Sequence, residues 1–382
     1  MKPTEWLFIF VLVFRIASHS ISGKRRQVFL SNSDLTNIAV ENRTGVVYLG
    51  GVNSITKLSP DLKLLKAIKT GPLNDNEKCF PPDVMSSCKF KRKLTDNINK
   101  ILILYEQKDQ LIACGSVYKG FCEMRNLSTL VSLKWTGYFI ASSDNHSAVG
   151  MIAPSINGNL KFYVGASWTK SDIELGRNTF GVYAFVSRNI EIDNEKFGFG
   201  LLTLSIDDIG VDMKNVKDGW NIKCQFVFSS GFFSYFVFSF GENSQAKQTA
   251  IGRVCQKRGT YDSYVQIPLE CKSANGTNYN LIQSAVVSQA GAALAENLGI
   301  KANKDVLFAV FAKSDSLTSF SPSSESAVCV YSVEELDKTF RENIELCVKT
   351  QVKSKELPWL KMTSDKCVAE VGTLLYLNLM FA

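Results

Sequence analysis

The stretch QLIACGSVYKGFCEMRNL, residues 110–127, places two apolar runs on either side of a turn that is rich in small residues. β-branched and aromatic residues fit a half-buried pleated surface, while Gly and Ser supply the turn between two strands. The stretch is therefore predicted to form a β-hairpin. Stretches of the same form lie at residues 46–59, 160–168, 234–256 and 305–333.

The spacing of these five hairpin candidates favours a β-propeller. Counted from Tyr48, Leu111, Phe162, Phe236 and Leu307, the intervals are 63, 51, 74 and 71 residues. A four-stranded blade with inserted loops occupies a length of this kind. A β-sandwich, or two of them, also shows short strands separated by turns and stays open as the alternative.

Two segments have helical character. Residues 280–299 are rich in Ala, Leu, Gln and Glu towards their end, with Gly299 as the expected stop. Residues 332–346 open with a Ser-x-x-Glu capping box at Ser332 and Glu335. We expect one or two helices inserted in an otherwise all-β chain.

The amino-terminal residues have the form of a secretory signal. Lys2 precedes an apolar run at residues 6–14, and residues 20–22 offer the small side chains that a signal peptidase requires. A membrane-spanning helix needs about 20 apolar residues, and Arg15 interrupts this run too early for that. Residues 1–22 are therefore predicted to be a signal peptide that is removed after Ser22.

The cysteines and the sequons fit a secreted protein. All ten cysteines follow the signal, as expected of an oxidising compartment, and no C-x-x-C pair is present for a zinc ribbon or a redox centre. Asn-x-Ser/Thr sequons begin at Asn42, Asn126, Asn145 and Asn275. We expect these four asparagines on surface loops, because a glycan cannot be packed in a core.

The charge of the chain does not indicate a nucleic-acid partner. The formal net charge is +7 over 382 residues, and the one dense basic cluster is KFKRK at residues 89–93. A nucleic-acid-binding protein is expected to show a broader basic surface, so this cluster is interpreted as a solvated loop.

Catalytic residues are scarce. His146 is the one histidine beyond the signal, and it lies inside a sequon. Paired acids occur at Asp207–Asp208 and at Glu334–Glu335, and the second pair opens a predicted helix, where acids are favoured by the dipole. A non-catalytic role is the preferred interpretation. Residues 198–203, GFGLLT, lack the third glycine of a nucleotide fingerprint. We expect no enzyme, no cofactor, no metal and no small-molecule substrate; a propeller hydrolase and a purely structural secreted protein are the alternatives.

Several blocks of sequence carry a family resemblance. They are TGPLNDNEKCFPPDVMSSC (70–88), TDNINKILILYEQKDQLIACGSVYKGFCEMRNL (95–127), YDSYVQIPLEC (261–271), NLIQSAVVSQAGAALAENLGIKANKDVLFAVFAK (280–313) and SAVCVYSVEELDK (326–338). From about residue 28 to Cys367 the chain resembles the sema domain of plexins, the cell-surface receptors for semaphorins. The resemblance implies a seven-bladed β-propeller whose first mature strand pairs into the last blade. Semaphorins themselves and the hepatocyte growth factor receptor group are the nearest alternatives.

The resemblance also orders the cysteines, which spacing alone does not do. It implies the pairs Cys79–Cys88, Cys114–Cys122, Cys271–Cys329 and Cys347–Cys367. Cys255 matches a cysteine whose family partner lies beyond Cys367, so we expect Cys255 to lack that partner. Cys224 has no family counterpart and is interpreted as a small buried apolar residue, although pairing between Cys224 and Cys255 stays open.

The chain leaves the family pattern at Val368. About five of seven blades precede this point, so residues 23–367 are interpreted as a partial sema domain and residues 368–382 as a divergent apolar tail. The tail is too short for a membrane-spanning helix. A truncated product or an incomplete gene model is the expectation, with a glycolipid-anchor signal as the alternative.

The partner follows from the resemblance. It implies a semaphorin-binding module that is secreted or, as part of a longer receptor, lies on the extracellular face of the plasma membrane. The transmembrane and cytoplasmic signalling regions expected of a plexin are not found in this sequence, so a truncated module is the expectation. Semaphorins are expected to contact the middle blades, here residues 170–178 and 187–199, with Arg188, Glu195 and Lys196 as candidate contacts. Homo-association through sema domains is a second expected contact.

Expression in eukaryotic cells should give a product that begins after Ser22 and that becomes smaller on treatment with N-glycosidase. Amino-terminal sequencing and gel mobility measure both properties. An intact Met1 together with unchanged mobility would contradict the secretory assignment.

Overall fold

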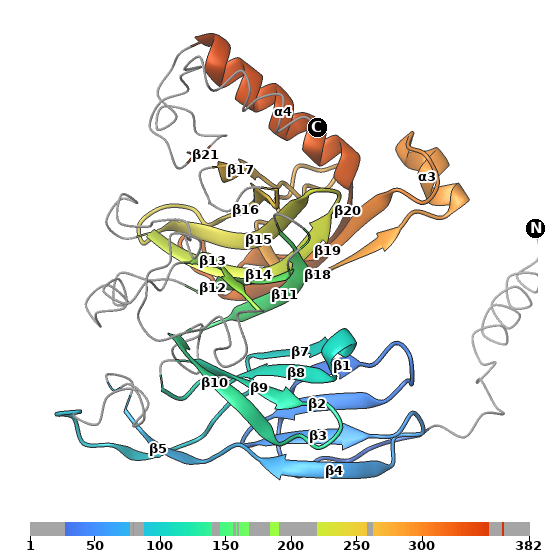
Figure 1. Ribbon diagram of the computed structural model, residues 1–382. Helices are drawn as coiled ribbons and strands as arrows, with labels where there is room; N and C mark the ends of the chain where they lie inside the picture. The colour runs from blue at the N-terminus through green and yellow to red at the C-terminus, as the bar shows by residue number, and fades with distance from the viewer. Residues whose placement is uncertain are drawn as a thin grey trace, which may run out of the picture.

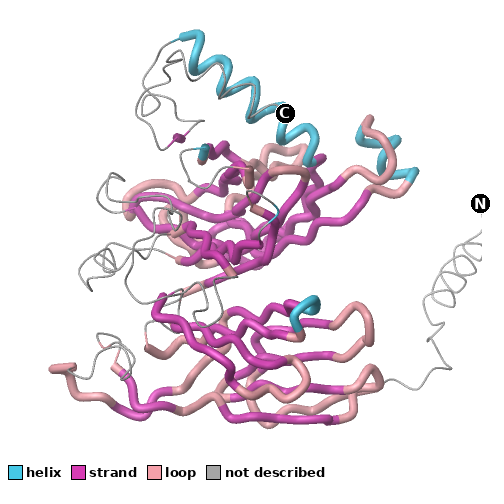
Figure 2. Tube along the Cα trace, viewed as in Figure 1, coloured by secondary structure: helices cyan, strands magenta, loops and turns pink. Residues whose placement is uncertain are grey.

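The computed structural model describes residues 27–76, 79, 88–118, 120–139, 146–155, 158, 160–167, 184–190, 220–257, 263–350 and 361–362. This part of the chain is mostly β-strand, arranged in antiparallel sheets that follow one another along the sequence (Figures 1 and 2). The all-β prediction is confirmed.

Each large sheet is built from strands that are consecutive in the chain, apart from one short addition to sheet 4. Sheet 1 holds β1 (Leu35–Val40), β2 (Val47–Gly51), β3 (Ser54–Leu58) and β4 (Leu64–Lys69), and sheet 2 holds β7 (Ile101–Tyr105), β8 (Gln110–Cys114), β9 (Phe121–Asn126) and β10 (Ser132–Phe139). Sheet 3 holds β11 (Ala148–Pro154), β12 (Leu160–Ala166) and β13 (Phe185–Asn189). Sheet 4 holds β14 (Trp220–Ser230), β15 (Phe233–Glu242), β16 (Gln248–Cys255), β17 (Val265–Pro268) and the short β21 (Lys361–Met362), and sheet 5 holds β18 (Leu281–Gln289), β19 (Asp305–Ser314) and β20 (Pro322–Ser332). A separate two-stranded ribbon pairs β5 (Leu73–Asp75) with β6 (Lys93–Thr95).

Four of the five predicted hairpins are confirmed. They are the pairs β2–β3, β8–β9, β15–β16 and β19–β20. The fifth stretch, residues 160–168, contains the single strand β12, which pairs with β11 before it and β13 after it.

The sheets stack in series through their first strands. β7 contacts both β1 and β11, and β14 contacts both β11 and β18. Sheets 2, 3 and 4 therefore each lie between two others, whereas the two layers of a sandwich would each have one neighbour.

Strand β8 shows why the middle sheets carry nearly continuous apolar runs. Leu111 and Ala113 belong to a cluster with Tyr48 of sheet 1. Their neighbours Ile112 and Cys114 belong to a cluster with Phe162 of sheet 3. Successive side chains of a strand point to opposite faces, so a sheet with a neighbour on each side needs apolar residues at every position.

The predicted helix at residues 280–299 is wrong in its first half. Residues Leu281–Gln289 form β18, because their alternating side chains pair with β19 along its length. Tertiary pairing overrides the helical composition there. The helix α3 is confined to Ala292–Leu298 and ends at Gly299, whose φ of 65° lies in the left-handed region, as the glycine stop predicted.

The second predicted helix is confirmed as α4, Val333–Thr350. The Ser332 hydroxyl accepts a hydrogen bond from the Glu335 backbone N–H at 3.3 Å, which is one half of the expected capping box. A further short turn, the 3-10 helix η1 (Glu106–Lys108), joins β7 to β8.

The described residues contain three disulfides, Cys79–Cys88, Cys114–Cys122 and Cys271–Cys329. They are three of the four pairs that the resemblance implies. The fourth, Cys347–Cys367, lies outside the described residues, because Cys367 and the side chain of Cys347 are not described.

Cys224 and Cys255 are free, buried thiols, so they do not pair with each other. A Cβ placed on Gly165 of sheet 3 would lie 2.3 Å from the Cys224 sulfur, so the thiol fills the space that this glycine leaves. Burial raises the pKa of the Cys224 thiol. Cys224 is thus a packed, unreactive residue, in line with its interpretation as a small apolar side chain.

A buried ion pair fastens α4 to sheet 4. The Arg253 guanidinium, on a side chain only 3% exposed, lies 2.7 Å from an Asp337 carboxylate oxygen, and the Tyr235 hydroxyl donates to the same oxygen at 2.6 Å. The guanidinium also lies 4.1 Å from the ring centroid of Phe233 and 4.5 Å from that of Phe340. Burial, together with the Asp337 charge, raises the pKa of Tyr235, which therefore remains a hydrogen-bond donor.

Replacing Asp337 with Ala should lower the free energy of unfolding by about 2–3 kcal/mol, because it leaves the Arg253 guanidinium buried without a counter-charge. A larger loss is not expected, since Asp337 is partly exposed and solvent weakens its attraction to Arg253. Chemical denaturation followed by fluorescence measures this loss. Glu342→Ala, an exposed acid on the same helix, is the matched control and should stay within about 0.5 kcal/mol of the unsubstituted chain. Equal stability of the two variants would contradict the anchoring role.

Candidate functional site

The described residues do not offer a metal site. Among them, no three His, Cys, Asp or Glu side chains lie close enough together to hold a metal ion. The acids Glu334 and Glu335 lie in the first turn of α4, as expected of residues that complement a helix dipole. The pair Asp207–Asp208 and residues 198–203 lie outside the described part of the chain.

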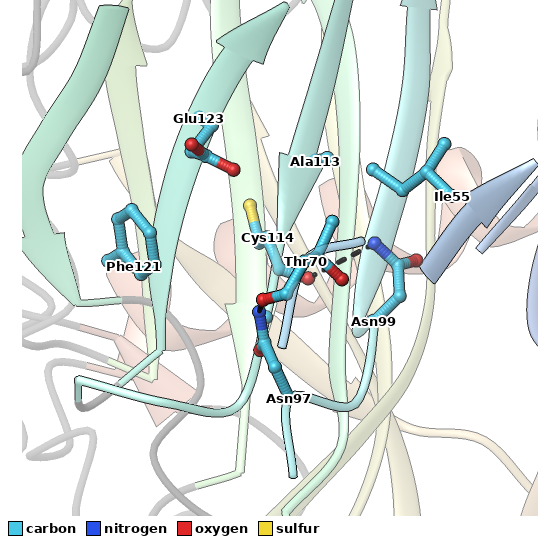
Figure 3. A pocket seen from close by; sticks show the side chains of 9 residues that line it. Ile55, Thr70, Asn97, Asn99, Ala113, Cys114, Phe121 and Glu123 are labelled. Atoms are coloured by element: carbon cyan, nitrogen blue, oxygen red, sulfur yellow. Dashed lines mark hydrogen bonds between the residues drawn. The ribbon is translucent and has the colours of Figure 1, made fainter. Parts of the chain in front are cut away.

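A polar hollow lies where sheets 1 and 2 meet (Figure 3). Its lining residues are Ile55, Thr70, Asn97, Asn99, Ala113, Cys114, Gly115, Phe121 and Glu123. Asn97 and Asn99, on the segment that leads into β7, provide its central polar groups.

Both asparagines are fully engaged by the protein. The Asn97 amide nitrogen donates to the Thr70 carbonyl at 2.9 Å, and its oxygen accepts from the Ser116 N–H at 3.0 Å. The Asn99 amide nitrogen donates to the Ile101 carbonyl at 3.2 Å. Its oxygen accepts from the Asn37 amide at 2.9 Å. These amides join sheet 1 to sheet 2, so the two asparagines at the centre of the hollow have a structural role.

Two glycines allow the Asn97 and Asn99 side chains to lie close to the backbone of the neighbouring strands. A Cβ on Gly115 would lie 1.9 Å from the Asn97 side-chain oxygen, and a Cβ on Gly50 would lie 2.2 Å from that of Asn99. Only glycine leaves space for the two amides at these positions.

Of the three predicted partner-binding residues, the described part of the chain contains only the backbone of Arg188. Arg188 lies on β13, opposite Phe162 of β12, in the outermost described strand of sheet 3. The Arg188 side chain, Glu195, Lys196 and residues 170–178 lie outside the described residues. The structure thus places the Arg188 backbone and leaves the grouping of the three side chains untested.

The predicted glycosylation sites differ in their surroundings. Asn42 and Asn275 are exposed in turns. Asn126 is the last residue of strand β9 and is half-buried, so it does not lie on a surface loop as expected, and its amide nitrogen donates to an Asp109 carboxylate oxygen at 2.8 Å. Asn145 lies outside the described residues.

The outer faces of sheets 1 and 5 carry exposed apolar side chains. The sequence does not distinguish these side chains from core residues, because they alternate with apolar residues that are buried. On sheet 5, the side chains of Val286, Val310 and Val328 are 57%, 40% and 66% exposed. Val310 lies directly opposite Val328, on the face turned away from sheet 4. On sheet 1, Ile38 and Leu64 are exposed on the face turned away from sheet 2, while Val47, Leu49 and Leu58 of the same face are buried beside Phe29 and Leu62.

No described helix is long and apolar enough to cross a membrane.

Comparison with known proteins gives a consistent set of relatives. A family model described as Sema domain matches residues 282–373. The chain is 31% identical over 370 residues to Plexin-A4 of Danio rerio and 30% identical over 361 residues to Plexin-A4 of Homo sapiens. Each alignment covers 88% of this chain and 18% of the relative, so the chain spans about a fifth of the length of these proteins.

Solved structures agree with the sequence comparison. The full extracellular region of Plexin A4 superposes with a TM-score of 0.74 at 29% identity, covering 88% of this chain and 38% of that one. Drosophila Semaphorin 2a superposes with a TM-score of 0.54 at 16% identity, covering 82% of this chain and 50% of that one, and so shares the fold. On this similarity in sequence and structure, the chain contains a sema domain of the plexin type.

Proposed function

We propose that the chain is an extracellular semaphorin-binding module of a plexin-like receptor, and that it acts by binding and not by catalysis. The observation that carries this proposal is the similarity to the extracellular region of Plexin A4 across 88% of the chain. The family to which that relative belongs binds semaphorins. A binding module needs a rigid rim, and sheets packed on both faces supply one.

The proposed contact surface is the outer edge of sheet 3 and the segments that flank β13. Its candidate residues are Arg188, Glu195 and Lys196. The position of β13 supports this choice, because it is the outermost described strand of its sheet, and binding residues are often carried by the segments that connect the strands of a rigid scaffold. Sheet 3 also lies in the middle of the series of sheets (Figure 1).

The two exposed apolar faces support a larger ring. Contiguous apolar surface on a soluble protein marks an interaction site. In the proposed account, residues 1–22 are removed as a signal and residues 23–367 form part of a sema domain with a seven-bladed propeller. The remaining blades of this propeller pack on the outer faces of sheets 1 and 5. Homo-association through the same faces is the second candidate, which these exposed valines also favour.

The double charge reversal Arg188→Glu and Lys196→Glu should weaken binding to a secreted semaphorin roughly tenfold at low salt and less at high salt, because rim charges act mainly through screened, long-range attraction. Surface plasmon resonance at two salt concentrations measures the effect.

The matched control is Lys301→Glu with Lys338→Glu, which makes the same charge change at exposed sites near α3 and on α4. Unchanged affinity of the first variant would remove the β13 edge from consideration. A chain that binds none of the secreted semaphorins would contradict the proposed function itself.

A further inference from the structure

The ribbon β5–β6 presents a dense group of exposed positive charges. Its basic segment, Lys89–Lys93, contains the exposed side chains of Lys89, Lys91 and Lys93 and the half-buried Arg92. The ribbon continues directly from the outer strand of sheet 1 and extends beyond that sheet (Figure 1). The segment is therefore reachable from solvent without displacing any part of the five sheets.

Several contacts hold the basic segment in place. The Cys79–Cys88 disulfide ties down the residue before Lys89. The Asn76 amide nitrogen donates to the Lys91 carbonyl at 3.0 Å. The Arg92 guanidinium lies 5.8 Å from the ring centroid of Tyr118. A backbone fixed in this way loses less conformational entropy when a ligand binds than a free loop would.

The lysine charges are not neutralised within the described structure. None of Lys89, Lys91 and Lys93 makes an ion pair with a described residue, unlike Lys63 beside Asp61. The acid opposite Lys93 in the ribbon is Asp75, which is buried and accepts a hydrogen bond from the Tyr118 N–H at 2.8 Å. The carboxylate of Asp75 is thus used inside the protein, and the lysine ammonium groups face solvent.

The charge of the whole chain is concentrated in the same region. Residues 27–139, which contain sheets 1 and 2 and the ribbon, hold 15 Lys and Arg against 10 Asp and Glu. Residues 140–382 hold 23 against 25. A long anionic ligand would therefore meet an attractive potential around the ribbon and a nearly neutral surface elsewhere.

Phe90 gives the segment a second property. Its side chain is 49% exposed, between Lys89 and Lys91 in the sequence. An aromatic ring beside cations suits a ligand that alternates apolar ring faces with anionic groups, as the pyranose rings and sulfates of a sulfated polysaccharide do.

We infer that the basic segment Lys89–Lys93 is a binding site for sulfated glycosaminoglycan chains of the cell surface or matrix. The cluster is short for a nucleic-acid surface, and the exposed ring distinguishes it from a purely electrostatic contact with an anionic membrane. This site is separate from the β13 edge, so it does not depend on the semaphorin proposal.

The test is binding of the full secreted, glycosylated chain to immobilised heparin. The triple substitution Lys89→Ser, Lys91→Ser and Lys93→Ser should lower the affinity at least about tenfold and move elution to a lower salt concentration, because it removes the exposed charges from the ribbon. The control triple Lys301→Ser, Lys304→Ser and Lys338→Ser makes the same change in net charge elsewhere and should elute with the unsubstituted chain. Circular dichroism melting of each variant verifies that the fold is kept.

Three further probes separate the sources of binding. Fully desulfated heparin should not bind. Phe90→Ser should weaken binding to heparin more than binding to polyphosphate, which has no sugar ring. Equal loss in the two triple variants, or binding to phosphatidylserine vesicles that is as tight as to heparin and that is lost with the ribbon lysines, would overturn the proposal.

Discussion

The need to bury both faces of each inner sheet governs this structure. Strand β8 sends Leu111 towards sheet 1 and Ile112 towards sheet 3, and β15 sends Tyr235 towards sheet 5 and Phe236 towards sheet 3. Neither sheet could be stable alone, because a sheet that is apolar on both faces leaves one of them in water unless a neighbour covers each. The order of the sheets along the chain then becomes their order in space, and the first strands of successive sheets meet.

Polar groups at the contacts between sheets serve this stacking. Asn97 and Asn99 join the two sheets through space left by Gly115 and Gly50, and the nitrogen and oxygen of each side-chain amide make hydrogen bonds within the protein. The centre of the described structure consequently has little left with which to recognise a ligand. The two recognition surfaces proposed above, the outer edge of sheet 3 and the basic ribbon β5–β6, both lie outside these contacts between sheets.

Local patterns in the sequence predicted local structure well. The β8–β9 hairpin and the start of α4 at Ser332 depend on neighbouring residues, so their signals are readable along the chain. Residues 281–289 were predicted as helix from their amino-acid composition. They form a strand because they pair with β19, which is distant in sequence, so the composition of the segment alone does not show it. The packing of Cys224 beneath Gly165 and the pairing of Arg253 with Asp337 join distant segments, so no local pattern encodes them. The disulfide pairs came from the family resemblance, and the candidate contacts Glu195 and Lys196 lie outside the described residues.

Hydrogen–deuterium exchange of the secreted chain tests the central claim most directly. β15 and β19 are both central strands hydrogen-bonded on two sides, but β15 lies between sheets 3 and 5. β19 instead exposes Val310 on the outer face of sheet 5, where the residues around α3 cover only the part near Val306 and Phe308. The account predicts that the amides of β15 exchange markedly more slowly than those of β19, because opening β15 requires two sheet contacts to separate. Equal protection of the two strands would show that the outer face of sheet 5 is covered in solution, and would contradict a stack that ends there.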